Sequence, residues 1–258
     1  MRLLAAISWT IVCTAILIPG CTQNQDRRAE IEATKQIRVG TDATYPPFES
    51  VDPSTQKVVG FDADMIRQVF GNLGYEVEFI VVPFDGITAG LHTGKYDVIV
   101  SAFTITPERK ERVLFSDPYY DAGQTIAVPL HDSVTQTTED LRGKRAGVQL
   151  GTTGERLAKQ IDELEVFSYD NISAAFIDMA NGKLDAVIND KPTSERYIAV
   201  QHDAKLVGQL LSQEQYGVAF RRTDTWLHEM FNAEFAKFKD TEAFKKLHDT
   251  YIRGNASP

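Results

Sequence analysis

The chain has 258 residues, 43% of them hydrophobic and 24% charged, and its formal net charge is −9. This composition is typical of a soluble globular protein with one large domain or two modest ones. The 27 basic residues form no block and do not alternate with aromatic residues, which argues against a nucleic-acid partner because phosphate binding requires a clustered positive surface.

The first twenty residues have the pattern of a secretory signal. Arg2 precedes the apolar run LLAAISWTIVCTAILI, and the stretch PGC follows, so we expect residues 1–20 to be a signal peptide. The stretch LIPGC resembles the lipobox of bacterial lipoproteins, which implies that Cys21 becomes the lipidated N-terminus. The alternatives are an uncleaved membrane anchor or a plain signal followed by a chance cysteine. Because Cys13 leaves with the signal, no intramolecular disulfide is available to the mature chain.

Residues 21–36 are expected to form a flexible tether. They are polar and contain no aromatic residue, so they bury too little apolar surface to become ordered. Folded structure is expected to begin at the stretch IRVG, residues 37–40.

Short strands then alternate with single helices along the chain. Strands are predicted at residues 36–42, 76–83, 96–103, 145–149, 165–170 and 184–190. Helices are predicted at residues 60–74, 85–94, 154–162, 171–182 and 192–201. This alternation predicts an α/β fold with parallel sheets covered by helices on both faces. A strand over residues 216–220 and helices over 224–240 and 241–252 follow.

A partial internal repeat indicates two similar lobes. FDGITAGL (84–91) matches YDNISAAF (169–176), and GKYDVIVSA (94–102) matches GKLDAVIND (182–190). Each copy contains one buried strand, which ends in Ser101 and Ala102 in the first lobe and in Asn189 and Asp190 in the second. Because ligands of open α/β sheets bind beyond the carboxyl ends of the strands, we expect these ends to face one cleft.

Arg109 is the candidate anion-binding residue. Thr106, followed by a proline, predicts a helix start, which places Arg109 in the first turn beside the end of the buried strand. Its planar guanidinium suits a carboxylate, and Thr104 can add a hydroxyl group. Alternatively, Arg109 is a surface arginine paired with Glu108 or Glu111.

Two aspartates and two aromatic residues are further candidates. Asp190 ends an apolar strand, where a carboxylate is costly unless it is paired, so it either holds a ligand cation or forms a structural salt bridge. Asp42 ends the first strand in the same way. Tyr45 and Phe84 lie near strand ends as well, and each is either a pocket residue or part of the core.

The stretch GTTGERLAKQI begins another helix. Thr152 and Glu155 have the spacing of a capping box, which leaves backbone N–H groups at the helix start. Such a terminus attracts anions, although the motif also serves as a plain helix cap.

Together these motifs resemble a known family. GTDATYPPFES, GFDADM, SAFTITPERKERVLFSDPYY, LRGKRAGVQLGTTGE, GKLDAVINDKP and QYGVAF occur in this order, and the chain from about residue 36 to 253 is similar to the periplasmic polar amino-acid-binding proteins of bacterial ABC importers, solute-binding protein family 3. The resemblance implies a two-lobed periplasmic-binding-protein fold of type II, with two hinge strands. It implies a first lobe of residues 37–123 and 217–254 and a second lobe of residues 124–216.

The resemblance also implies the roles of individual residues. Arg109 would clamp the ligand α-carboxylate, Asp190 would take the α-ammonium, and Thr153 would mark the helix start that completes the carboxylate site. Gln149 stands where glutamine-binding members have lysine. The expected ligand-binding set is Asp42, Tyr45, Phe84, Ser101, Ala102, Phe103, Thr104, Arg109, Gln149, Thr153 and Asp190.

The resemblance leaves the ligand open between arginine, lysine, histidine and glutamine. GTT and TYPPF look like the basic-amino-acid binders, whereas Phe84, NDKP and QYGVAF look like the glutamine binders. We expect a monomeric binding protein in the periplasm or on the outer face of the cell membrane, held there by lipid on Cys21, with an ABC permease as partner.

Two other classes share this fold. One is a cyclohexadienyl or arogenate dehydratase, which needs an acid in the cleft, and the other is the sensor lobe of a kinase or channel. The intact pair of Arg109 and Asp190 favours binding over catalysis, and the lack of a second apolar span favours a stand-alone protein. We expect no cofactor and no metal, because the sequence has no histidine pair at metal spacing, no glycine-rich phosphate loop and no GxSxG motif.

Overall fold

The computed structural model describes the backbone of residues 19–254 and the side chains of residues 27–254. The chain divides into an N-terminal unit that ends at Thr34 and a large unit that begins at Lys35. Most of the predicted signal peptide, residues 1–18, and the side chain of Cys21 lie outside the described residues. No helix within the described residues has both the length and the apolar character that a bilayer-spanning segment requires.

The N-terminal unit contains one described helix, α1 (Pro19–Thr34). The prediction of an unordered segment over residues 21–36 is therefore wrong for its local structure. Arg28 pairs with Glu32 one turn later at 2.8 Å, and ion pairs at this spacing stabilise a helix by about 0.2–0.5 kcal/mol each. Ile31 of this helix is fully buried, so one apolar side chain and local side-chain pairs together stabilise a segment that the argument from composition took to be unordered.

The first lobe of the large unit is built on a five-stranded mixed sheet. Strand β1 is parallel to β5 and β6, and β15 is antiparallel to both of its neighbours, β6 and β7. In sheet order the strands are β5 (Glu76–Val81), β1 (Gln36–Thr41), β6 (Val98–Ile99), β15 (Ala219–Arg221) and β7 (Val113–Phe115). The helical segments of this lobe are α2 (Phe61–Asn72), η1 (Phe84–Gly86), α3 (Ile87–His92), α4 (Pro107–Lys110), α8 (Thr225–Lys239), α9 (Glu242–His248) and η3 (Asp249–Arg253). A small antiparallel sheet contains β2 (Thr44–Tyr45), β3 (Glu49–Val51) and β4 (Val58–Val59).

The second lobe repeats this topology. Strand β10 is parallel to β11 and β12, and β9 is antiparallel to both of its neighbours, β12 and β13. In sheet order the strands are β11 (Glu165–Tyr169), β10 (Arg145–Gln149), β12 (Ala186–Asp190), β9 (Gln124–Pro129) and β13 (Ala204–Val207). The helical segments are η2 (Glu139–Leu141), α5 (Thr153–Ala158), α6 (Ile172–Ala180) and α7 (Lys191–Gln201).

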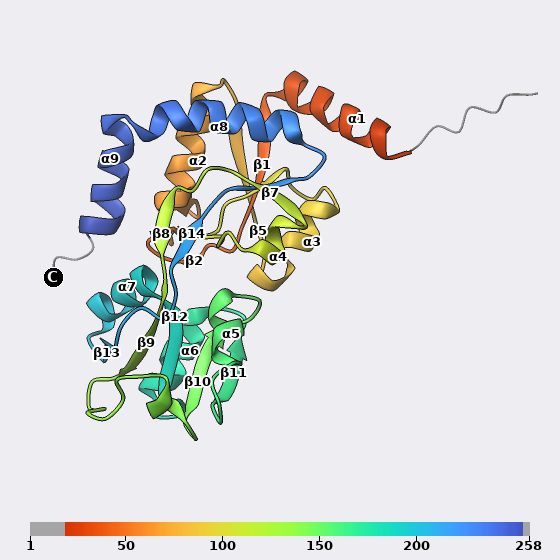
Figure 1. Cartoon of the computed structure of the whole chain (residues 1–258). Helices are drawn as coiled ribbons and strands as arrows, with labels where there is room; N and C mark the ends of the chain where they lie inside the picture. Colours follow the sequence, from red (N-terminus) through yellow and green to blue (C-terminus); the bar gives the residue numbers. More distant parts are fainter. Residues whose placement is uncertain (1–18, 255–258) are drawn as a thin grey trace, which may run out of the picture. The chain divides into compact units, whose positions relative to one another are not determined.

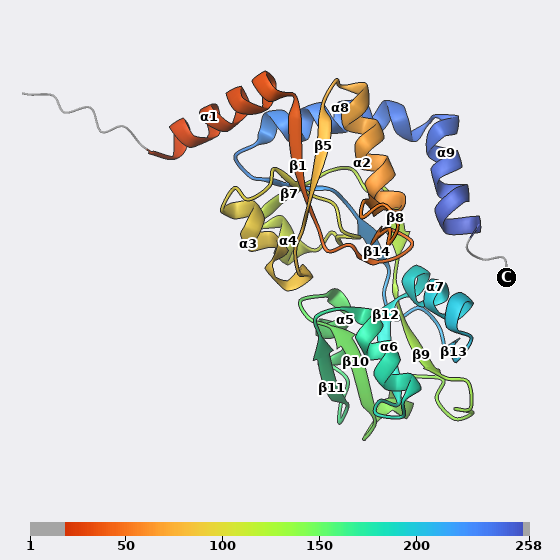
Figure 2. The same cartoon turned by 180° about the vertical axis from the view of Figure 1, so that it is seen from behind.

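Two chain crossings join the lobes. Strand β8 (Tyr120–Ala122) pairs with β14 (Glu214–Tyr216), and this ribbon leads into β9 of the second lobe and β15 of the first (Figures 1 and 2). In each sheet, the strand that is antiparallel to both of its neighbours (β9 or β15) is thus the first strand after the chain has crossed from the other lobe. The predicted two-lobed α/β fold with two hinge strands is confirmed, and residues 124–216 remain our proposed bounds for the second lobe.

The internal repeat is visible as the same ion pair in both lobes. The Arg38 backbone N–H and guanidinium both bond to Asp97, at 2.9 and 3.1 Å. The Arg145 backbone N–H and guanidinium bond to Asp185 in the same manner, at 2.8 and 2.9 Å. Each aspartate comes from the GKYD or GKLD stretch and fixes the first strand of its sheet against the loop before the buried strand.

Two glycines on these first strands also correspond. A Cβ atom on Gly40 would lie 2.5 Å from the Tyr96 ring, and one on Gly147 would lie 2.6 Å from a Leu184 methyl group. Tyr96 and Leu184 are the equivalent residues of the repeat. Each glycine therefore lets a large side chain pack directly on the strand backbone, which places apolar volume in the core of each lobe.

Two predicted strands are shorter than expected. Only Val98 and Ile99 of the predicted strand 96–103 pair as a strand, because the backbone turns at Ala102, which has a φ of 41°. The Asp62 carboxylate accepts the Ala102 N–H at 2.7 Å and holds this conformation. The predicted strand 216–220 divides into the end of β14 and the start of β15 because the chain crosses between lobes there.

Candidate functional site

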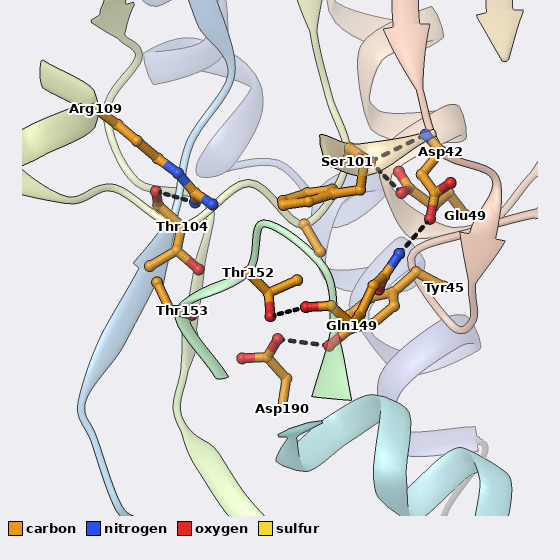
Figure 3. Close-up of a pocket in the computed structure, with 12 residues that line it drawn as sticks. Asp42, Tyr45, Glu49, Ser101, Thr104, Arg109, Gln149, Thr152, Thr153 and Asp190 are labelled. Carbon is orange, nitrogen blue, oxygen red and sulfur yellow. Dashed lines mark hydrogen bonds between the residues drawn. The ribbon is translucent and has the colours of Figure 1, made fainter. Parts of the chain in front are cut away.

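The carboxyl ends of β1, β6, β10 and β12 surround one pocket between the lobes (Figure 3). Ten of the eleven predicted residues line it, and Phe103 does not. Glu49 and Thr152, which were not in the predicted set, also line it. The complete lining is Asp42, Tyr45, Glu49, Phe84, Ser101, Ala102, Thr104, Arg109, Gln149, Thr152, Thr153 and Asp190.

Arg109 reaches the pocket from helix α4. Thr106 caps this helix by accepting the Arg109 N–H at 3.1 Å, as predicted. The guanidinium lies over the Phe103 ring, 4.1 Å from its centroid, so Phe103 supports the arginine from behind. It donates to Thr104 O at 2.8 Å and to Gly151 O of the second lobe at 3.2 Å. Since a guanidinium has five N–H groups, donors remain for a carboxylate in the pocket.

The alternative interpretation of Arg109 as a paired surface arginine is wrong. Glu108 pairs instead with Arg156 of the second lobe. Burial lowers the pKa of Arg109 to about 10, which still leaves the side chain charged at neutral pH. Arg109 therefore supplies a desolvated positive charge to the pocket.

Asp190 lies at the end of β12 and is 6% exposed. Its carboxylate accepts the Tyr45 hydroxyl at 2.6 Å and the Gln124 amide at 2.9 Å. Burial, followed by the nearby negative charge of Glu214, raises the pKa of Asp190 to about 7. It forms no ion pair with any residue that the structure describes, so the structural salt bridge is not present within this part of the chain. A ligand cation is the partner that would favour its ionised form.

Asp42 ends β1 on the opposite side of the pocket. It accepts hydrogen bonds from Thr44 at 2.6 Å and from the Gln149 amide of the second lobe at 2.9 Å. Burial raises its pKa. Gln149 thus presents an amide where a lysine would have placed a positive charge against this carboxylate.

Glu49 is a carboxylate of the pocket that the sequence analysis missed. Together with Asp42 it forms the acidic wall of the pocket. It accepts the Thr41 hydroxyl at 2.7 Å and the Ser101 hydroxyl, and burial raises its pKa well above the ordinary value. It pairs across the small sheet with Tyr45, and opposed residues of an antiparallel pair share a face. The hairpin register of TYPPFES would therefore have indicated Glu49, had it been predicted.

Thr152 and Thr153 belong to the start of helix α5. Thr152 accepts the Glu155 N–H at 3.1 Å, as predicted, but the Glu155 carboxylate accepts the Gly151 N–H at 2.8 Å instead of closing the box on Thr152. The Thr153 hydroxyl donates to Glu214 at 2.8 Å. Glu214, on hinge strand β14, was not predicted, because nothing in its local sequence places it behind the pocket.

The pocket is polarised. Figure 3 shows Arg109 at one side and Asp42 and Glu49 at the other, with Asp190 apart from both, at the end of β12. The described residues contain no cluster of three or more His, Cys, Asp or Glu side chains suited to a metal ion. The arrangement suits a small ligand with a carboxylate at one end and positive or donor groups elsewhere.

Residues 37–254 match the sequence profile of the bacterial extracellular solute-binding proteins, family 3. The chain belongs to this family. This solute-binding protein is 32% identical over 226 residues to the ABC transporter arginine-binding protein 1 of Escherichia coli, covering 85% of the chain and 92% of that protein.

Solved structures agree with this assignment. The arginine-bound form of a truncated ArgBP from T. maritima is 40% identical, with a TM-score of 0.79 over 81% of this chain and 99% of that one. An ancestral amino-acid-binding protein, a precursor of cyclohexadienyl dehydratase, is 36% identical, with a TM-score of 0.82 over 87% of this chain and 98% of that one.

Proposed function

We propose that this protein binds a free basic amino acid, arginine first, outside the cytoplasmic membrane and delivers it to the permease of an ABC importer. The observation that carries the proposal is the charge distribution of the pocket, in which the single cation Arg109 faces three carboxylates. These carboxylates are Asp42, Glu49 and Asp190.

The two ends of an amino-acid backbone fit the two lobes. The α-carboxylate pairs with the guanidinium of Arg109 in the first lobe, where planar bidentate hydrogen bonds are available. The α-ammonium pairs with Asp190 in the second lobe. Because the ligand contacts both lobes, it binds the closed form more tightly than an open one and draws the hinge shut.

The acidic wall selects the ligand side chain. A guanidinium or ammonium tip would lie against Asp42 and Glu49, and its positive charge would favour the ionised carboxylates that burial disfavours. Phe84 and Tyr45 add apolar surface along the alkyl chain. A second carboxylate on the ligand would bury a negative charge without a cation and bind poorly. Glutamine, whose amide can donate to the same wall, is the second ligand candidate.

The names of the relatives support this choice. The similar Escherichia coli protein is named as arginine-binding and as part of an ABC transporter, and the T. maritima structure contains arginine. We also propose that the chain works as a monomer in the periplasm or on the outer face of the membrane, held there by lipid on Cys21.

A dehydratase activity is the competing function. One observation favours it, because Glu49 has a raised pKa inside the pocket and could donate a proton, and one similar structure is a precursor of a dehydratase. We propose that the protein is not an enzyme, since the Thr41 and Ser101 hydroxyls both point their protons at Glu49. Release of water from arogenate by the purified protein would contradict this.

The deciding experiment is a calorimetric panel of the twenty common amino acids with the purified protein. We expect arginine, lysine, histidine or glutamine to bind at least tenfold more tightly than glutamate, which is about 1.4 kcal/mol. Arginine is expected to rank first. Glutamate as the tightest ligand would overturn the acidic-wall argument, and the lack of binding by every amino acid would overturn the function.

A further inference from the structure

One carboxylate oxygen of Glu214 accepts a hydrogen bond from a hydroxyl of each lobe. Its Oε2 atom accepts the Thr104 hydroxyl of the first lobe at 2.9 Å and the Thr153 hydroxyl of the second at 2.8 Å. Its Oε1 atom accepts the Ser212 hydroxyl at 2.8 Å. Both threonines line the amino-acid pocket and Glu214 does not, so this carboxylate lies directly behind them.

The directions of these hydrogen bonds are determined by chemistry. A carboxylate only accepts, so the protons of both threonine hydroxyls point at Glu214 and away from the pocket. The Thr153 oxygen also receives the Gln124 amide at 3.1 Å, and the same amide nitrogen donates to Asp190 at 2.9 Å. Asp190 requires the amide in this orientation, because the opposite one would place two acceptors together. Thr153 therefore cannot donate to Gln124, and its hydroxyl proton points at Glu214.

A hydroxyl whose proton is committed elsewhere can only accept. The Thr104 oxygen therefore presents lone pairs to the pocket, which the carboxylate of Asp190 also lines. Lone pairs suit an ammonium and repel a carboxylate, so this hydroxyl belongs with the ammonium end of the ligand.

The charges around Asp190 also favour the ammonium end of the ligand at this place. Glu214 and Asp190 repel each other, and this repulsion contributes after burial to the raised pKa of Asp190. The other groups that face Asp190 are the hydroxyls of Tyr45 and Tyr216, the Gln124 amide and, more weakly, Arg109, and the two hydroxyls and Arg109 lower its pKa. An ammonium bound here would relieve the repulsion between the two carboxylates.

We propose that Glu214 is a positioning residue for the α-ammonium of the ligand, acting through the hydroxyl of Thr104 and tying Thr153 to the same carboxylate in the closed form. The proposal rests on amino-acid binding as the function. It makes the protonated α-amine a requirement of the site, so that a ligand with the same carboxylate and side chain but no amine gains nothing from Glu214.

The test removes the negative charge of Glu214 and keeps the size of the side chain. Glu214→Gln is compared with wild type by calorimetry, using L-arginine and 5-guanidinopentanoate, which is arginine without its α-amine. Glu195→Gln is the matched control, because Glu195 lies on the same depression behind the hinge, is exposed and pairs with Lys191. Thermal melting of each variant checks that it is folded.

We expect Glu214→Gln to weaken arginine binding at least tenfold and to leave the weak binding of 5-guanidinopentanoate within threefold, whereas Glu195→Gln changes neither. Equal losses for both ligands would show that Glu214 only holds the closed form together, and an unchanged arginine affinity would show that it does nothing. Either result overturns the inference.

A pH series supplies a readout that a structural role would not change. Removing the charge of Glu214 lowers the pKa of Asp190, so the pH below which arginine binding weakens should move down in Glu214→Gln. A parallel loss of affinity at every pH would count against the inference. Wild-type protein that binds no amino acid would overturn the proposed function itself, and the inference would fall with it. Wild-type binding with an unaffected Glu214→Gln variant would overturn the inference alone.

Discussion

Gln149 of the second lobe donates a hydrogen bond of 2.9 Å to Asp42 of the first, so that one bond crosses the pocket at its acidic end. The same amide also donates to Asp170 O at 3.2 Å. A cationic ligand tip would compete with this amide for the Asp42 carboxylate and would be the stronger partner, because its positive charge attracts the carboxylate directly and the neutral amide carries no charge. This relationship makes Asp42 the natural point at which to test the ligand class.

Replacing Asp42 with Asn should discriminate between ligands. We expect Asp42→Asn to weaken arginine binding tenfold or more and glutamine binding by less, since only the cation loses a charge partner. Calorimetry with both ligands measures the two ratios. Asp117→Asn is the control, because Asp117 is an exposed carboxylate of the first lobe outside the pocket lining. Equal losses for arginine and glutamine would contradict the role of Asp42.

Replacing Arg109 with Ala should nearly abolish binding without unfolding the protein. A buried carboxylate that loses its charged partner typically costs about 2–5 kcal/mol. Arg109→Lys should also bind poorly, because an ammonium cannot reproduce the planar pair of donors. Arg112→Ala is the control, since Arg112 is exposed just beyond the same helix. Binding by Arg109→Ala within threefold of wild type would show that the clamp is elsewhere.

Amino-acid affinity should fall as the pH falls through about 7. The pKa of Asp190 is raised to about 7 in the ligand-free pocket, mainly by burial, so below this pH the free protein carries a neutral Asp190. The ammonium requires the ionised form, and each pH unit below 7 should therefore weaken binding by up to about tenfold. The pocket should bind tightly and without pH dependence from this group above pH 7.

Glutamine is the better ligand for this pH measurement, if it binds. Its neutral amide places no charge against Glu49, whose raised pKa would otherwise add a second titration in the same direction. Asp190→Asn should bind weakly at every pH and lose most of the dependence. Affinity that is constant from pH 5 to 8 would argue against Asp190 as the ammonium partner.

The repeated ion pairs should differ in their contribution to stability. The Asp97 side chain is fully buried between Arg38 and Arg221, whereas the Arg145–Asp185 pair is about 36–39% exposed. Breaking a buried pair costs about 3–5 kcal/mol, and an exposed pair contributes about 0–1 kcal/mol. We expect urea unfolding to show a large loss for Asp97→Ala and a small one for Asp185→Ala. Similar losses in the two variants would mean that burial does not set the energy of this repeated pair.

Cys21 should be required for membrane attachment. We expect Cys21→Ser to move the protein from the membrane fraction to the soluble fraction or to block removal of the signal. Cys13→Ser is the control, because Cys13 lies within the proposed signal peptide, residues 1–20. Mass spectrometry of the membrane-bound protein gives the direct check, and an unmodified Cys21 inside the chain would contradict lipidation.

The secondary structure of the two lobes was largely predictable because its signals are local. The strand over residues 145–149 and the helix start at Thr106 depend on apolar periodicity and on caps, which act over a few residues. The repeated stretches also revealed the two lobes, and the ends of the buried strands correctly indicated where the pocket lies. Arg109 and Asp190 followed from the same local logic.

Sequence reasoning failed at two segments where specific side-chain contacts outweigh composition and periodicity. Helix α1 forms in a polar segment that composition alone assigns to a tether, because Ile31 is fully buried and charged side chains one turn apart pair along the helix. The predicted strand over residues 96–103 ends early because Asp62, distant in sequence, accepts the N–H of Ala102 and turns the backbone.

The sequence by itself determined the α/β class, the repeat, and the basic and acidic residues at the strand ends of the pocket. Only the tertiary structure decided that Glu49 lines the acidic wall and that Glu214 lies behind the threonines. Glu49 reaches the pocket through the pairing of a short hairpin, and Glu214 through a hinge ribbon that returns about a hundred residues after the first crossing. Such positions depend on contacts between segments far apart in the chain, and no pattern within either segment encodes them.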